Sequence, residues 1–251
     1  MLPRIPPSLI LFALLLAGWE GYCRLSGASP MILPPPSRVA RALLAERTTI
    51  GGHALATLSV AALGFTLSVV FAFIASVALH GLPWAERALM PLFVASQTVP
   101  LVALAPLMIL WFGFGLLPKV LLVVLVTFLP MLLSLLSGYR QTPADFRDLL
   151  VSMGAGRWTV FRRATLPSAR APFLAGLRIS ATYAIVATIF AEYAGARQGL
   201  GIYILAAKNN FRADLVLAAV VVSAALTLAL LAILQLADRL TARGPQERPD
   251  A

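Results

Sequence analysis

Six apolar runs, most of them about 20 residues long, constrain the fold of this chain more than any other feature. The first and shortest covers residues 5–19, and the others cover residues 54–79, 90–112, 119–137, 176–194 and 215–236. A helix of about 20 apolar residues is long enough to cross the hydrocarbon core of a bilayer. The sequence therefore predicts an all-α, multi-pass integral membrane protein with six transmembrane helices.

The composition agrees with a membrane location. Hydrophobic residues make up 60% of the chain and charged residues 12%, whereas soluble domains carry about 25% charged residues. The net charge of +10 could suggest nucleic acid, but outside residues 140–178 the basic residues are scattered between apolar runs. We therefore expect membrane lipid and partner proteins, and no nucleic acid, as partners.

Cysteine and histidine offer little chemistry. Cys23 stands alone, so no disulfide can form within the chain. His53 and His80 have no Cys or His partner at the spacing of metal ligands, and we predict no metal site because ligands come in clusters.

The chain divides into three parts. Residues 1–53 hold the first apolar run and a proline-rich external connection, which includes a surface helix at residues 37–47. The first run could be a signal peptide, but no small-x-small cleavage site follows cleanly, which favours a retained helix. Residues 54–239 form the core transmembrane domain, and residues 240–251 form a cytoplasmic tail expected to be disordered.

The basic residues indicate which way the helices cross. With the amino terminus inside, twelve Arg and Lys residues are cytoplasmic and eight are external. Seven of the twelve lie between residues 140 and 178, so this segment decides the orientation under the positive-inside rule. Both termini are then cytoplasmic.

The long polar segment 140–178 has a readable local structure. Thr142 suits an N-cap, Pro143 the first helical position, and Asp145 the positive end of the helix dipole. Gly154 suits the left-handed position after the last turn. The helix between them places four apolar residues on one face: Phe146, Leu149, Leu150 and Met153.

A second short helix is expected at residues 157–165, ended by the pair Leu166-Pro167, because proline disfavours helix at the residue before it. Such a pair of helices could be a solvated loop lying on anionic lipid. Alternatively, the apolar stripe beside a basic face suits a groove on a partner protein.

The spacing of Asp148, Gly154 and Leu166-Pro167 resembles the cytoplasmic signature of the permease subunits of bacterial ABC importers. The chain departs from that signature at Leu149, Leu150 and Ala164, and has Asp148 where the signature has glutamate. In that family this segment docks into the ATP-binding subunit. The resemblance assigns this coupling to Asp145, Phe146, Asp148, Leu149, Leu150, Met153, Gly154, Leu166 and Pro167.

Two further segments resemble the permeases for nitrate, sulfonates and taurine, namely residues 107–115 and residues 191–222 with their Gly-Leu-Gly. The resemblance implies the importer-permease (MetI-like) fold in a bacterial inner membrane. It also implies a homodimer, two ATP-binding subunits, an external solute-binding protein and alternating access. The solute would be nitrate, a sulfonate or taurine, or else a thiamine-precursor pyrimidine or riboflavin.

Polar residues inside the spans are candidates for the translocation pathway. Three prolines make the third span irregular, which is tolerated only inside a helix bundle or beside a water-filled cavity. An acid in a span indicates function, although Glu192 could instead be hydrated or bond a neighbouring backbone. The candidates are Gln97, Thr98, Tyr183, Thr188 and Glu192.

The chain lacks the motif for ATP hydrolysis. A P-loop needs Gly-Lys-Ser/Thr to hold phosphates, and the two lysines, Lys119 and Lys208, follow proline and alanine. We therefore expect no catalytic residue and no cofactor in this chain, with ATP and magnesium held by the partner ATPase. The alternative is a secondary transporter or channel that works without an ATPase, although we find no inverted repeat or cluster of intramembrane charges.

Overall fold

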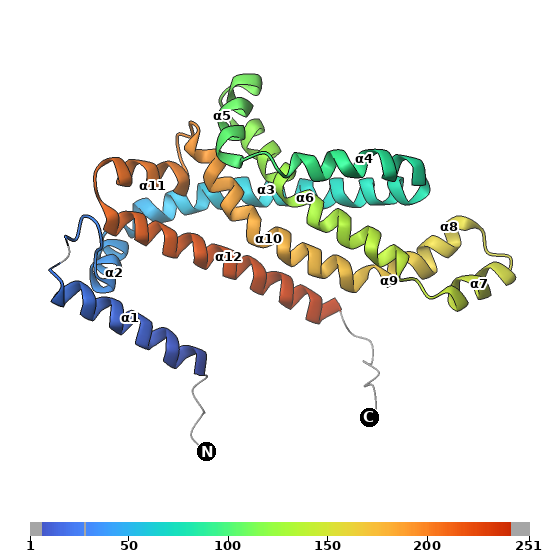
Figure 1. Ribbon diagram of the computed structural model, residues 1–251, viewed down its shortest axis with the longest axis horizontal. Coiled ribbons are helices and arrows are strands. Elements are labelled where there is room, and N and C mark those ends of the chain that lie inside the picture. Colours follow the sequence, from blue (N-terminus) through green and yellow to red (C-terminus); the bar gives the residue numbers. More distant parts are fainter. Residues whose placement is uncertain (1–6, 28, 242–251) are drawn as a thin grey trace, which may run out of the picture.

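The computed structural model describes residues 7–27 and 29–241, and every regular element within them is helical. Most of the predicted tail, residues 240–251, lies outside the described residues. Figure 1 shows long helices side by side, with α2 and α11 at one end and α7 and α8 at the other. We call these the α11 end and the α7 end.

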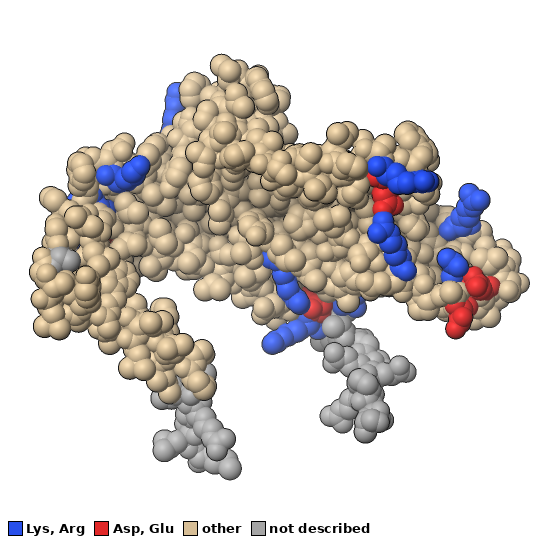
Figure 2. Space-filling view, in the orientation of Figure 1, with Lys and Arg blue, Asp and Glu red and all other residues tan. Residues whose placement is uncertain are grey.

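The elements follow in the order α1 (Pro7–Leu25), α2 (Pro36–Ala45), α3 (Arg47–Gly81), α4 (Pro83–Ser96), α5 (Leu101–Phe112), α6 (Leu116–Arg140), α7 (Ala144–Ser152), α8 (Arg157–Val160), the π-helical turn η1 (Phe161–Thr165), α9 (Leu166–Ser168), α10 (Arg170–Tyr193), α11 (Leu200–Asn209) and α12 (Ala213–Thr241). Within the described residues, α1, α3, α6, α10 and α12 are each long and apolar enough to cross a membrane. The pair α4 and α5 supplies a sixth span when counted together. The fold prediction is therefore confirmed. Figure 2 shows the charged side chains of this face in a few separate groups, one of them in the lower middle, with uncharged surface between them.

The third span is not the continuous helix predicted at residues 90–112. It is broken between Ser96 and Leu101, and α4 and α5 are bent by 102°. Pro100 has no amide hydrogen and disfavours helix at Val99, so the helix ends before it. The side-chain amide of Gln97 at the break donates a hydrogen bond from Nε2 to the Leu125 carbonyl of α6, at 2.7 Å. The break is therefore fixed to the bundle.

The helix α6 forms the centre of the bundle, with α3 and α10 packed along it. Its side chains Val123, Met131 and Leu132 are fully buried. Small residues allow the neighbouring helices to approach closely. A Cβ on Gly64 of α3 would lie 2.6 Å from Val123, and one on Gly176 of α10 would lie 2.7 Å from the Ser134 Cβ. This is the packing expected between membrane helices.

The helix α3 begins seven residues before the predicted span. Ile50, in this added part, is 1% exposed and packs with α2, α11 and α12. The apolar run alone predicted too short a helix, because the first turns of α3 are stabilised by contacts with segments that are distant in sequence. The α11 end is therefore a small packed layer of its own.

Ion pairs hold the helix ends together. At the α11 end, Asp214 accepts two hydrogen bonds from Arg212, at 2.9 and 3.1 Å, and lies 3.6 Å from Arg38 of α2. The hydrogen bonds to Asp214 raise the pKa of the Arg212 guanidinium, which stays charged. At the α7 end, Asp238 of α12 pairs with Arg178 of α10 at 2.8 Å.

Candidate functional site

The segment that resembles the importer signature, residues 144–168, forms a projection at the α7 end, and we call it the coupling segment. Its first helix starts one residue later than predicted. Pro143, with φ −57° and ψ 129°, occupies the N-cap position. Thr142 does not cap the helix, because its hydroxyl donates to the Tyr139 carbonyl at 2.8 Å.

Gly154 adopts the predicted left-handed conformation, with φ +79°. Its amide donates to the Val151 carbonyl, and the Ala155 amide donates to the Leu150 carbonyl, at 2.9 and 3.0 Å. These bonds close the end of α7 and turn the chain into α8. A residue with a Cβ disfavours this φ, so the turn depends on glycine.

The apolar face of α7 is open. Every residue of α7 is described, and none is buried. Leu150 is half-buried, whereas the other three predicted face residues are exposed: Phe146 by 45%, Leu149 by 55% and Met153 by 75%. Asp145 and Asp148 are exposed on the same helix, and Trp158 of α8 adds a further exposed aromatic ring.

The prediction that Leu166-Pro167 stops the second helix is wrong. The helical path continues from α8 through the π-helical turn η1 and into α9, and only Ala169 separates it from α10. Pro167 lies in the first turn of α9, where a missing amide hydrogen costs little. The coupling segment is therefore joined to α10 almost without a break.

An aromatic cluster anchors the base of the coupling segment. The Phe161 ring lies 5.4 Å from that of Tyr139 on α6 and 5.5 Å from that of His80 on α3. The Tyr139 hydroxyl is hydrogen-bonded to Ser76 at 3.0 Å. Ala169 packs so closely on Gly138 that a Cβ there would lie 2.7 Å from the Ala169 Cβ. The base of the coupling segment thus contacts α3 and α6 and leads into α10.

A polar cluster at the α11 end joins α3 and α10 to the first turn of α11. The Glu192 carboxylate is fully buried and accepts hydrogen bonds from the Thr57 hydroxyl, at 2.9 and 3.0 Å, and from the Gly201 amide at 2.8 Å. Thr57 in turn accepts the Leu200 amide at 2.7 Å, and His53 Nδ1 accepts the Gly199 amide at 3.1 Å. We call these three side chains the α11 cap, since they satisfy three successive amides at a helix start.

The Gly-Leu-Gly sequence is explained by this cap. A Cβ on Gly199 would collide with the Glu192 carboxylate, and the residue has φ +132°. A Cβ on Gly201 would lie 2.7 Å from the Glu192 Cβ. The Tyr203 ring covers His53 with 5.2 Å between centroids, and burial raises the pKa of its phenol.

The five pathway candidates fall into two groups. Gln97, Thr98 and Tyr183 are exposed, whereas Thr188 and Glu192 are fully buried. Thr188 donates to the Ala184 carbonyl of its own helix at 2.8 Å. Their role in a pathway stays a prediction.

Sequence reasoning did not find the other cap residues, Thr57 and His53. The signal available was their i, i+4 spacing on one face of α3. Their distance in sequence from Glu192 hid the contact. Elsewhere, among the residues that the structure describes, no group of three or more His, Cys, Asp or Glu side chains is placed to hold a metal ion.

Five apolar spans in the described part of the chain, or six when α4 and α5 are counted together, and an exposed amphipathic helix on an anchored projection are typical of a membrane transport subunit that works with other proteins. Residues 64–243 match the family described as the binding-protein-dependent transport system inner membrane component. The chain belongs to this family and is a permease subunit of an ABC transporter. The match decides against the alternative of a secondary transporter or channel.

Several proteins similar to this chain are named as permeases of transport systems. The riboflavin transport system permease protein of Chloroflexus aurantiacus is 37% identical over 92% of this chain and 87% of its own length. The formylaminopyrimidine transport permease protein of Halalkalibacterium halodurans is 35% identical over 77% and 78%. The taurine transport system permease protein of Escherichia coli is 32% identical over 84% and 80%.

Solved structures share the fold. A chain of the MetNI methionine ABC transporter, in an inward-facing conformation, matches with a TM-score of 0.63 at 14% identity, over 76% of this chain and 96% of that one. A chain of an amino acid ABC transporter matches with a TM-score of 0.65 at 13% identity, over 79% and 96%. At such identities the likeness establishes the fold alone.

Proposed function

We propose that the chain is the permease of an importer that works as a homodimer with two ATP-binding subunits and an external solute-binding protein. The observation that carries this proposal is the open apolar face of α7 at the tip of the anchored coupling segment. An exposed amphipathic helix of this kind is suited to a groove on a partner. ATP and magnesium belong to that partner, because this chain has no P-loop lysine.

The anchoring of the coupling segment supports a mechanical role. Its base is buried, at Phe161 and Ala164, while its tip is exposed. When two ATP-binding subunits close, they bring the two coupling segments of the dimer together. Because η1 and α9 lead into α10, this displacement tilts the helices and switches the bundle between inward-open and outward-open states.

The orientation places the α7 end in the cytoplasm together with both termini. Seven arginines between residues 140 and 178 support this assignment. The α11 end then faces outward and is the side that meets the solute-binding protein.

A second copy of the chain is supported by the unequal burial of the spans. In α6, 56% of the apolar window is buried within the subunit, whereas the values are 6% in α1 and 11% in α12. These two helices therefore offer apolar surface to lipid or to another subunit. A pathway enclosed by two copies would receive exposed polar residues such as Gln97, Thr98 and Tyr183.

The relatives suggest a range of solutes. Their names specify riboflavin, formylaminopyrimidine and taurine transport. All three are small polar compounds, and we propose that this chain transports a small solute of the same range, including sulfonates and nitrate.

Reconstitution with a candidate ATP-binding subunit and a candidate solute-binding protein from the same organism tests the proposal. ATPase activity is measured in proteoliposomes, with candidate solutes added one at a time. We expect stimulation that requires the loaded binding protein and an intact coupling segment. If no ATPase associates with the chain, the proposed function is wrong.

A further inference from the structure

A cavity of about 910 Å³ opens at the α11 end, away from the coupling segment. It is bounded by α3, by the start of α6, and by the connection between α10 and α11. Pockets of about 300–1,000 Å³ are typical of small-molecule sites. The size therefore suits a small solute.

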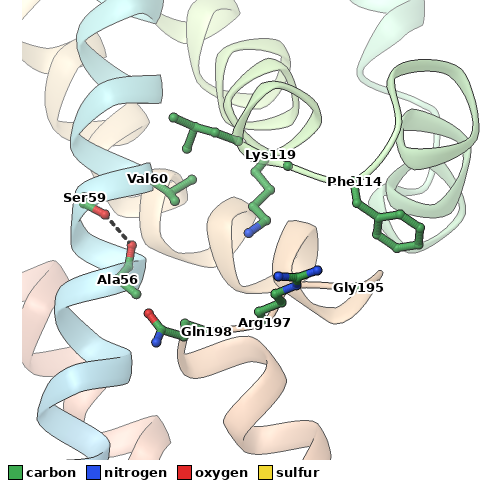
Figure 3. Close-up of a pocket in the computed structure, with 10 residues that line it drawn as sticks. Ala56, Ser59, Val60, Phe114, Lys119, Gly195, Arg197 and Gln198 are labelled. Atoms are coloured by element: carbon green, nitrogen blue, oxygen red, sulfur yellow. Dashed lines mark hydrogen bonds between the residues drawn. The ribbon is translucent and has the colours of Figure 1, made fainter.

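Two cationic side chains converge on this cavity. Figure 3 shows Lys119 of α6 and Arg197 of the α10–α11 connection extending toward each other. Of the described residues that line the cavity, none is acidic. By contrast, an acidic side chain pairs with each of seven other arginines: Arg24, Arg38, Arg140, Arg147, Arg170, Arg178 and Arg212.

The nearby acid of the α11 cap does not complete the pair. Glu192 interacts electrostatically with Lys119, but its oxygens already accept the Thr57 hydroxyl and the Gly201 amide. Among the described residues, no ion pair within 4.0 Å involves Lys119 or Arg197. Lys119 and Arg197 therefore face the same cavity, and neither has an acidic side chain within 4.0 Å as an ion-pair partner among the described residues.

The rest of the lining suits an anion with an apolar body. The N-terminus of α6 opens into the cavity at Gly115 and Leu116, and a helix N-terminus favours negative charge. Gln198 offers a side-chain amide donor on the opposite side, as Figure 3 shows. The Ser59 hydroxyl nearby donates to the Ala56 carbonyl at 2.7 Å. Phe114 contributes an apolar wall. Its ring packs so closely on Gly195 that a Cβ added to this glycine would lie 2.7 Å from the ring.

We propose that this cavity binds the transported solute through an anionic group, such as a sulfonate, carboxylate or phosphate, before it passes into the membrane. An anion between Lys119 and Arg197 accepts charge-assisted hydrogen bonds from both and removes their mutual repulsion. The inference deepens the proposed function and depends on it for the outward orientation of the α11 end.

Lysine labelling tests the site directly, because the chain has two lysines and only Lys119 lines the cavity. Lys208 is exposed on α11 and serves as the internal control. The full-length chain in phosphatidylcholine nanodiscs is acetylated with an amine-reactive reagent, and each lysine is quantified by mass spectrometry. Ethanesulfonate is the probe, and ethyl methyl sulfone is its neutral counterpart.

We expect ethanesulfonate to slow acetylation of Lys119 at least threefold, with no change at Lys208 and no effect of the sulfone. Arg197→Gln abolishes the protection, whereas Arg41→Gln, which removes an exposed cation of α2 outside the cavity, preserves it. Equal protection of both lysines, equal protection by the sulfone, or no protection overturns the proposal.

A second arm identifies the source of the anion. In nanodiscs that contain phosphatidylglycerol, a solute site still shows additional protection by ethanesulfonate. Full protection by the lipid alone would mean a headgroup site and would overturn the solute proposal. The assay contains no ATPase, so its failure leaves the coupling proposal standing, and a failure of ATPase association leaves the labelling result standing.

Discussion

The two ends of the molecule use α-helices of nearly equal length in opposite ways. At one end α11 is enclosed, and its first amides are satisfied by Glu192, Thr57 and His53 from two other helices. At the other end α7 leaves its apolar side chains open. The difference shows that α11 is stabilised within the subunit, whereas the apolar face of α7 is left for the proposed contact with the ATP-binding subunit. Substitutions at the two ends should therefore affect different measurements.

The largest effect is expected at the open end. The double substitution Phe146→Asp with Leu149→Asp places charge on the apolar face that is proposed to meet the ATPase. Because the loss of a central hot-spot side chain costs about 2 kcal/mol or more, the loss of two such side chains corresponds to about 4 kcal/mol, and we expect binding of the ATPase to weaken by about 1,000-fold. The thermal midpoint of the isolated permease stays the same, since both side chains are exposed. Affinity from surface plasmon resonance checks the first point, and retained binding would contradict it.

The enclosed end should show the reverse pattern. Glu192→Ala removes the acceptor of the Thr57 hydroxyl and the Gly201 amide in a fully buried site, so we expect a loss of about 3 kcal/mol of stability. Thermal unfolding in detergent measures it, and Glu192→Gln, which retains an acceptor, should lose less. Equal stability of the alanine variant and the parent would contradict the role of the α11 cap.

The glycine turn provides a matched pair of variants. Gly154 has φ +79°, Gly156 has φ −69°, and an added Cβ meets nothing within 4 Å at either. Gly154→Val therefore destabilises the turn by about 1–2 kcal/mol, because a residue with a side chain is strained at this φ. Gly156→Val causes almost no such backbone strain. We expect solute uptake to fall several-fold in the first variant and to stay unchanged in the second. Similar uptake in both would show that the turn is unimportant.

The smallest effect is expected for the exposed pair Arg147 and Asp148, which are 3.4 Å apart. Exposed ion pairs contribute little because water and salt screen them. Asp148→Asn should change the stability of the permease by less than about 0.5 kcal/mol. A loss above about 1 kcal/mol in thermal unfolding would mean that this carboxylate has a structural partner elsewhere.

The sequence was most informative where one local property decides the outcome. Apolar length predicted the spans, and the glycine at position 154 predicted a left-handed turn that the structure confirms. Local rules misplaced helix ends where distant contacts decide them. Ile50 extends α3 by packing on α11 and α12. The wrong stop at Pro167 has a local reason instead, because the proline lies in the first turn of α9, where it is tolerated.

The site was predictable in part for the same reason. The open apolar face of α7 follows from its own spacing of side chains. The α11 cap does not, because Thr57 and Glu192 lie 135 residues apart and meet only when α3 and α10 pack together. The convergence of Lys119 and Arg197 likewise depends on tertiary structure, although the predicted topology already placed both on the external side.

Site-specific cross-linking tests the central claim, that α7 binds the ATPase, most directly. Cys23 is buried, so a benzophenone-maleimide can be attached at Met153→Cys, whose parent side chain is 75% exposed. Asn209→Cys, at an exposed position of the α11 end, is the control. The account predicts a photoproduct of permease and ATPase from position 153 and none from position 209. A product from position 209 alone, or none from position 153 in an intact complex, would contradict it.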